Sequence, residues 1–268
     1  MENIKNYLMI PRQFFTLNNG TKTTVFYQIG TEGFTIWTYM LMRQSNQTST
    51  EISIKRIQSF LNRTTGSKFK SEGLKDARTI KKYMVGIVVM GLIKIHDEIF
   101  ENFETKALTE KHKIAKEFLE DVRANEELVV SVNNPITDEG FEIISTQLFE
   151  DYVNKIGHIG WSIYCLLYKY HNVSYGNQSS GNYGFANPSR KFIGQILNIS
   201  ERTVAKFISE GKMPKGLISI EQQPCITHFN AVLGVEEQKQ EANHYKVWAK
   251  CDSENQYFIN ITPKDKAS

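Results

Sequence analysis

The sequence of 268 residues predicts an α+β protein, mainly α with small β wings, that contains two copies of one domain. Two observations lead to this prediction. Residues 29–37 and 156–164 share the pattern Ile-Gly-x-x-Gly-aromatic-hydroxyl-Ile-aromatic, in which seven of nine positions agree by identity or close kind. Shorter matches follow in the same order along both halves, and small changes in their offset indicate insertions in loops.

The shorter matches define the elements that each copy should contain. They pair residues 57–62 with 193–198, residues 78–80 with 202–204, and residues 91–95 with 216–220. The apolar spacing predicts helix, strand, helix, turn, helix, strand and wing in each copy. We therefore expect two tandem winged helix-turn-helix domains, over residues 1–103 and 135–268, joined by a linker helix over residues 104–134.

The second copy, in residues 187–220, carries the clearer helix-turn-helix pattern. Ser200 is a preferred N-cap residue, so it should start the second helix of the motif. Arg202, Thr203 and Lys206 then lie near the exposed N-terminal end of that helix. The apolar positions at i, i+3 and i+4 are Val204, Phe207 and Ile208. A helix with a cation and hydroxyls at this end suits a DNA major groove, and Arg190 and Lys191 are expected to hold phosphates.

In the first copy, the recognition helix is expected over residues 74–90. Its cationic side contains Lys75, Arg78, Thr79, Lys81 and Lys82. The turn that follows its strand contains His96, Asp97 and Glu98 and is acidic, so it is poorly suited to contact phosphate. The first copy is therefore expected to bind with its helix and with the basic turn before it.

Positive charge is concentrated on the two predicted recognition segments. The formal net charge of the chain is only +3, but residues 43–82 contain ten Lys or Arg against three Asp or Glu, and residues 189–215 contain six against two. Clustered cations of this kind indicate a polyanionic partner. The alternative is that they form solvated helix faces without a binding role.

The linker segment has an apolar stripe at three-four spacing. Its members are Leu108, Lys111, Ile114, Ala115, Phe118, Leu119 and Val122, with mixed charge around them. Such a helix can pack on one domain, or it can form a homodimer contact, because the stripe resembles two or three heptads.

Several classes of protein are excluded by what the sequence lacks. Three cysteines without CxxC spacing predict a reducing compartment and no disulfide framework, and the absence of a signal peptide or long apolar run predicts a cytoplasmic protein that does not span a membrane. The six histidines are scattered, and no Walker A, GxGxxG, GxSxG or HExxH motif is present. We expect no enzyme activity, no cofactor and no metal site.

The run Pro188-Ser189-x-x-x-Ile193-x-x-x-Leu197-x-Ile199-Ser200-x-Arg202-Thr203-Val204, followed by Gly216-Leu217-Ile218, resembles the winged-helix domain of phage and plasmid replication proteins from low-GC Gram-positive bacteria. It is also similar to the N-terminal domains of replisome-organiser and plasmid replication-initiator proteins. The resemblance implies binding to double-stranded DNA at origin or operator repeats. It covers about 35 residues in the second copy and less in the first, where a longer basic turn precedes the helix.

The function expected from these observations is sequence-specific binding of double-stranded DNA in plasmid or phage replication initiation. Eight phosphate contacts would give a slope of log K against log salt of about −7. A transcriptional repressor or partition adaptor with the same fold is one alternative. Another is a protein-interaction module that docks a host helicase or helicase loader.

Overall fold

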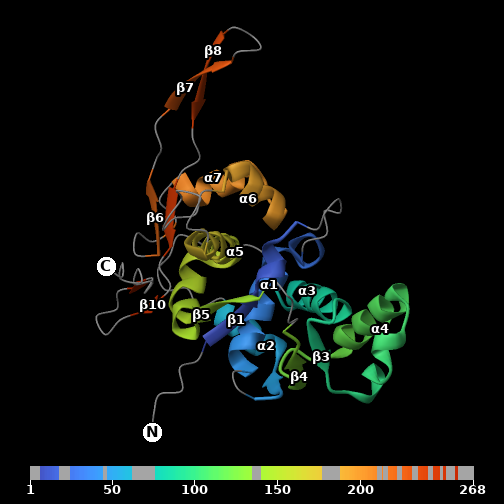
Figure 1. Cartoon of the computed structure of the whole chain (residues 1–268). Helices are drawn as coiled ribbons and strands as arrows, with labels where there is room; N and C mark the ends of the chain where they lie inside the picture. Colours follow the sequence, from blue (N-terminus) through green and yellow to red (C-terminus); the bar gives the residue numbers. More distant parts are fainter. Residues whose placement is uncertain are drawn as a thin grey trace. The chain divides into compact units, whose positions relative to one another are not determined.

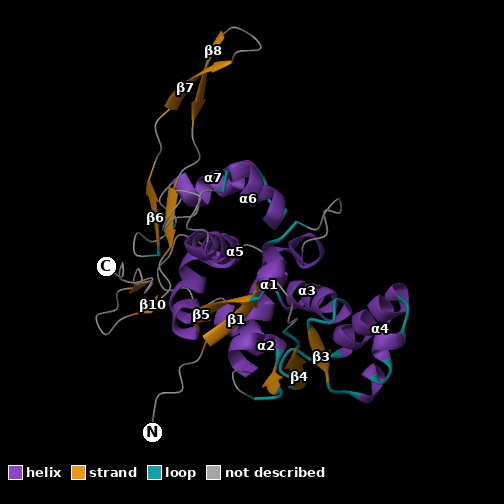
Figure 2. Ribbon diagram, viewed as in Figure 1, coloured by secondary structure: helices purple, strands orange, loops and turns teal. Residues whose placement is uncertain are grey.

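The computed structural model describes residues 7–17, 25–44, 47–61, 76–134, 140–176, 188–209, 213, 217–221, 225–230, 235–240, 244–247, 250–251 and 257–258. The chain forms two compact units, residues 1–162 with 196–198, and residues 163–195 with 199–268. Helices predominate and the strands form small antiparallel sheets (Figure 2), which confirms the mainly helical α+β class.

The first unit begins with a strand and a helix, and a second strand and helix follow near its end (Figure 1). Strand β1 (Tyr7–Pro11) leads through the 3-10 helix η1 (Arg12–Phe15) to helix α1 (Val25–Gln44), and strand β5 (Phe141–Ser145) leads directly into helix α5 (Thr146–Gly176). Between them lie β2 (Thr50–Ile52), α2 (Ile54–Leu61), α3 (Ala77–Val89), β3 (Ile93–Ile95), η2 (Glu98–Phe100), η3 (Phe103–Thr105), α4 (Leu108–Asp121) and β4 (Leu128–Val132).

A three-stranded antiparallel sheet has β4 at its centre, between β2 and β3. Val130 of β4 pairs with Thr50 on one side and with Ile95 on the other. Alternate β4 side chains are buried, as expected for a strand with one face on a core. Residues 104–134 therefore supply a helix and a strand to the first unit, in place of the predicted linker between two domains.

Strands β1 and β5 form a separate antiparallel ribbon, with Met9 opposite Ile143 at its centre. Arg12 Nε donates a hydrogen bond to Glu142 Oε1 over 2.6 Å, and the Glu142 side chain is only 2% exposed. A hydrogen-bonded cationic partner offsets part of the hydration that a carboxylate loses when it is buried to this degree. Because the ribbon binds β5 to β1, the two units divide within α5, and not near residue 134 as predicted.

Helices α1 and α5 are each interrupted at a glycine. Gly30 has φ 65° and ψ −179°, and Gly157 has φ 69° and ψ −179°, a backbone conformation almost confined to glycine. Both are the second residue of the matched segments 29–37 and 156–164, so the repeated sequence takes the same local shape twice. The residues that follow meet each other, since the buried Thr31 Oγ1 lies 2.8 Å from Nδ1 of the buried His158.

Aromatic side chains fill the core of the first unit. The ring of Phe14 lies 5.0 Å from that of Trp37, and the ring of Phe149 lies 4.8 Å from that of Trp161. Trp161 Nε1 also donates a hydrogen bond to Thr38 Oγ1 over 3.4 Å. Helix α1 and the first part of α5 therefore share one core, in which the indole N–H of Trp161 is bonded across to α1.

The second unit contains the later part of α5 and most of α6 (Arg190–Leu197). It continues with α7 (Glu201–Ser209), β6 (Ile218–Glu221), β7 (Cys225–Asn230), β8 (Val235–Gln240), β9 (His244–Val247), β10 (Lys250–Cys251) and β11 (Tyr257–Phe258). Strand β6 pairs with β9, and the chain between them forms the β7–β8 hairpin (Figure 1). Strands β10 and β11 form another antiparallel pair.

The glycine interruption gives a stability prediction. Gly157→Ala should lower the free energy of unfolding by about 1–3 kcal/mol, because the new Cβ meets no atom within 4 Å and the cost is backbone strain alone. Gly91→Ala is the matched control, since Gly91 also has open space and a φ of 69° but ends a helix, where the left-handed conformation costs less. Urea unfolding measures the stability of both variants. If Gly157→Ala loses no more stability than Gly91→Ala, the backbone conformation given to Gly157 is wrong.

Candidate nucleic-acid interface

Helix α3 is closed at both ends by local hydrogen bonds. Asp76 is its N-cap residue, and Asp76 Oδ1 accepts a hydrogen bond of 3.1 Å from the backbone N–H of Arg78. At the other end, the N–H groups of Gly91 and Leu92 donate to the carbonyls of Val88 and Ile87. These two hydrogen bonds, with Gly91 at positive φ, form the Schellman motif that commonly ends a helix at a glycine. The predicted helix over residues 74–90 is thus confirmed for residues 77–89.

One side of α3 is buried and the other carries cations. The buried side is formed by Ile80, Met84, Val85, Ile87 and Val88. Arg78 and Lys82 are exposed, and Thr79 between them is half-buried. These three predicted site residues therefore lie on the accessible part of the helix. Lys75 lies outside the described residues.

Lys81 differs from its neighbours, and the prediction that it faces DNA is corrected. Its Nζ donates hydrogen bonds to the backbone carbonyls of Glu120, over 3.0 Å, and Val122, over 2.6 Å. Carbonyls at the end of a helix have no intrahelical partner, and a lysine can satisfy them. Lys81 thus fastens the C-terminal end of α4 to α3, a role that sequence reasoning missed because it depends on where α4 packs.

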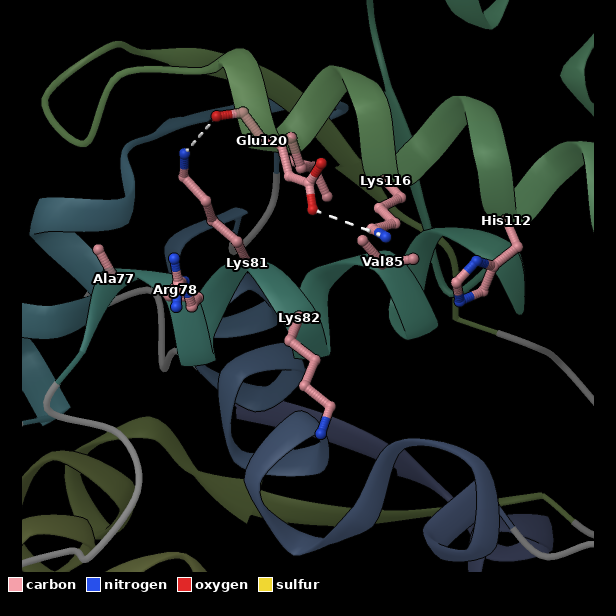
Figure 3. Close-up of a pocket in the computed structure, with 9 residues that line it drawn as sticks. Ala77, Arg78, Lys81, Lys82, Val85, His112, Lys116 and Glu120 are labelled. Atoms are coloured by element: carbon pink, nitrogen blue, oxygen red, sulfur yellow. Dashed lines mark hydrogen bonds and ion pairs between the residues drawn. The ribbon is translucent and has the colours of Figure 1, made fainter.

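A cationic groove lies between α3 and α4 (Figure 3). Its volume is about 640 Å³, and its lining residues are Ala77, Arg78, Lys81, Lys82, Val85, His112, Lys116, Leu119 and Glu120. Figure 3 shows Lys81 reaching toward α4, while Lys82 points away from it. Glu120 is the one carboxylate of this lining, and its Oε1 lies 3.9 Å from Lys116 Nζ. His112 and Lys116 were absent from the predicted site because their segment was interpreted as a linker.

The other side of α3 is tied to α1 through Tyr83. Burial raises the pKa of the Tyr83 phenol from its ordinary 10.0 to about 12, and the charge of Glu32 and the hydrogen bond that the phenol donates to it add to the rise. Glu32 Oε2 also accepts a hydrogen bond of 3.1 Å from the Thr31 hydroxyl, beside His158. Helix α3 is therefore held on one side by α4 and on the other by the interrupted part of α1.

In the second unit, a tight turn joins α6 to α7. Ser189 caps α6, since its Oγ accepts from the N–H of Phe192 over 3.1 Å. Asn198 has a φ of 53°, and the N–H of Ile199 donates to the carbonyl of Gly194. A Cβ on Gly194 would stand 2.7 Å from the Ile199 carbonyl oxygen, so only glycine allows this approach. An isolated glycine in a short amphipathic helix is a sequence signal for such a close approach.

Helix α7 begins as predicted. Ser200 Oγ accepts a hydrogen bond of 3.1 Å from the N–H of Thr203, and the two hydroxyl oxygens lie 2.8 Å apart. Ser200 and Thr203 thus bond to each other at the helix start. Arg202 and Lys206 are exposed, and Val204 is fully buried, so the cations lie on the accessible side.

The two predicted phosphate-binding residues of α6 differ in exposure. Arg190 is half-buried and Lys191 is exposed. Both lie in the first turn of α6, directly after the Ser189 cap. Most predicted residues of the second copy thus lie at the N-terminal ends of two consecutive helices, where free N–H groups also favour anions. Lys206 was predicted to lie near the N-terminal end of its helix but lies in the last turn of α7.

The helix caps of the two copies correspond. Ser53 Oγ accepts from the N–H of Arg56 at the start of α2, and it lies 136 residues before Ser189, the offset of the matched segments 57–62 and 193–198. Asp76 lies 124 residues before Ser200, the offset of residues 78–80 and 202–204. The first copy therefore also has a cap at the start of α3, where Asp76 takes the place of the serine.

In the described part of the chain, no group of three or more His, Cys, Asp or Glu side chains could hold a metal ion. Within the same residues, every helix is too short or too polar to cross a lipid bilayer.

Comparison of the chain with protein-family models, with curated proteins and with solved structures finds no match. Its function has to be inferred from its own residues.

The adjacent lysines of α3 allow a direct test of the assigned contacts. Lys81→Met should lower the free energy of unfolding by about 1–2 kcal/mol, because two carbonyls lose a charged hydrogen-bond donor. Lys82→Met removes an exposed lysine from the same helix and should change stability by less than about 0.5 kcal/mol. Urea unfolding compares the two, and equal losses would contradict the role given to Lys81.

Tyr83 gives a prediction on pH. Because its pKa is higher in the folded chain than the ordinary 10.0, its contribution to stability is complete below pH 10 and is lost as the pH rises through about 12. The wild type should therefore lose stability relative to Tyr83→Phe above pH 10, and Glu32→Gln should weaken this dependence. The free energy of unfolding measured from pH 8 to 11 tests this prediction. If it depends on pH in the same way for wild type and Tyr83→Phe, the Tyr83 phenol is not buried beside Glu32.

Proposed function

We propose that the chain binds double-stranded DNA with α3 and α7, as the recognition helices of two winged-helix domains, in plasmid or phage replication initiation. The order of elements in the first unit supports the winged-helix part. Helix α1, strand β2, helices α2 and α3 and strands β3 and β4 follow one another, with the sheet order β2-β4-β3. In the second unit, α6 and α7 are followed by the β6–β9 pair with the β7–β8 hairpin between its strands, in the place of a wing.

The observation that carries the proposal is the repeated presentation of an exposed arginine at a capped helix start. Arg78 follows the cap Asp76 by two residues, and Arg202 follows the cap Ser200 by two residues. Both arginines are exposed while the opposite helix side is buried in each case. A cap fixes the direction of the first turn, so each helix offers its cation in a defined orientation.

This arrangement suits duplex DNA in two ways. An arginine at the end of a helix in the major groove can donate two hydrogen bonds to the O6 and N7 atoms of guanine. The free N–H groups of the first helical turn favour phosphate oxygens, and so do the exposed lysines farther along the two helices, Lys82 and Lys206. The residues on the accessible side of each helix can thus read bases and hold the backbone.

The role in replication rests on the resemblance of residues 188–204 and 216–218 to initiator and replisome-organiser proteins. Selection of bound duplexes from a random pool tests both the binding and the role. Repeated sites beside a replication gene support initiation, whereas a palindrome over a promoter would assign the chain to repression.

Substitution of Arg202 separates base reading from phosphate binding. Arg202→Ala should cost about 1–3 kcal/mol of binding free energy and relax the preference for one base of the selected site. Arg202→Lys keeps the charge but cannot form the planar two-bond contact, so it should keep the salt dependence and lose the preference. Fluorescence anisotropy with the selected duplex and with single-base variants measures this.

The matched control is Lys113→Ala on α4, which removes a side chain that is 74% exposed and should leave binding unchanged. If Arg78→Ala and Arg202→Ala both bind like the control at every salt concentration, the proposed use of α3 and α7 is wrong.

A further inference from the structure

Helix α4 occupies the position in the first copy that a hairpin occupies in the second. The chain between β3 and β4 contains η2, η3 and α4, whereas the chain between β6 and β9 contains the β7–β8 hairpin. The turn at His96 that was predicted as a wing is followed by η2, whose cap Asp97 accepts a hydrogen bond from the N–H of Ile99. Helix α4 is therefore the large element of this insertion.

The position of α4 is fixed by packing and by one lysine. Ala115 and Leu119 are fully buried, and Val122 is 5% exposed, so one side of α4 is anchored to the first unit. Lys81 of α3 donates to the carbonyls of Glu120 and Val122 at its C-terminal end. The side chains that α4 places beside α3 are thus held at a defined distance from the recognition helix.

The groove between α3 and α4 is cationic, because four of its lining residues are Lys or Arg and only Glu120 is acidic. Lys116 of α4 and Arg78 of α3 line the same groove of about 640 Å³, and His112 lines it as well (Figure 3). Like charges brought together in this way repel one another unless an anion lies between them. Glu120 is the single carboxylate of the lining, and its distance of 3.9 Å from Lys116 makes it a weak partner, since both side chains are more than half exposed.

We propose that α4 serves as a helical wing, and that His112 and Lys116 bind the phosphodiester backbone of the duplex whose major groove α3 enters. The inference rests on the proposed function, because it requires α3 to contact duplex DNA. Lys116 supplies a charged N–H donor and His112 a ring N–H donor, and both recognise phosphate oxygens independently of base sequence. The groove opens along α3, so a phosphate held there lies beside a helix that reads the adjacent groove.

Two lysine–glutamate pairs of α4 provide a matched experiment. Lys116 and Glu120 line the groove, whereas Lys113 and Glu117 form a pair with the same spacing and a distance of 4.0 Å, and neither of them lines it. The full chain is titrated with its selected duplex over a range of salt concentrations. Lys116→Ala should weaken binding about three- to ten-fold for every sequence and lower the slope of log K against log salt by about 0.9, whereas Lys113→Ala should change neither.

The acidic partners should respond in the opposite direction. Glu120→Gln removes the competing carboxylate and should tighten binding about two- to five-fold, while Glu117→Gln should leave it within two-fold. Circular dichroism and urea unfolding establish that each variant is folded. His112→Gln, which keeps a side-chain N–H donor, should bind more tightly than His112→Ala.

The outcomes separate this inference from the proposed function. If Arg78→Ala weakens binding and Lys116→Ala behaves like Lys113→Ala, α3 binds DNA but α4 does not, and the helical wing is wrong. If the wild-type chain binds no duplex, both proposals fail. Pyrophosphate at fixed ionic strength tests whether the groove binds a free phosphate compound instead. If pyrophosphate raises the melting temperature of the wild type but not of Lys116→Ala, and Lys116→Ala binds DNA normally, the groove is a site for that ligand and not for DNA.

Discussion

The antiparallel pairing of β1 with β5 is the constraint on which the first unit depends. It joins strands centred on Met9 and Ile143, and it buries Glu142 against Arg12. The helices that follow each strand are interrupted at glycines of the same conformation, and they meet where Thr31 contacts His158. Because the contact joins residues one repeat offset apart, the two matched segments pack on each other as equivalent halves of one core.

Helix α3 is positioned by this core and by α4 together. Tyr83 bonds to Glu32, next to Thr31, and Lys81 bonds to the end of α4. Both sides of the helix are thus fixed by charged or polar contacts, while its buried side packs on the core. The backbone of α3 is therefore held from two sides, and under the proposed function a helix held in this way loses little conformational entropy when it binds duplex DNA.

The two copies share the residues that cap and interrupt their helices, and they differ in the segment between their paired strands. The caps correspond at Asp76 and Ser200 and at Ser53 and Ser189, and the interrupted helices correspond at their glycines. The segments between the last strands differ, because one copy has α4 there and the other has the β7–β8 hairpin. The shared parts place a helix start at the surface, and in the first copy the variable part places α4 beside it.

The sequence by itself determined the mainly helical class, the repeat, the start of α7 at Ser200 and the exposure of Arg78 and Arg202. These features depend on neighbouring residues, and periodicity and capping residues reveal such local preferences. Only the tertiary structure decided that β5 belongs with β1, that β4 is a central strand and that Lys81 holds α4. Each of these contacts joins residues about 40 to 130 positions apart, and local propensity carries no information about a partner at that distance.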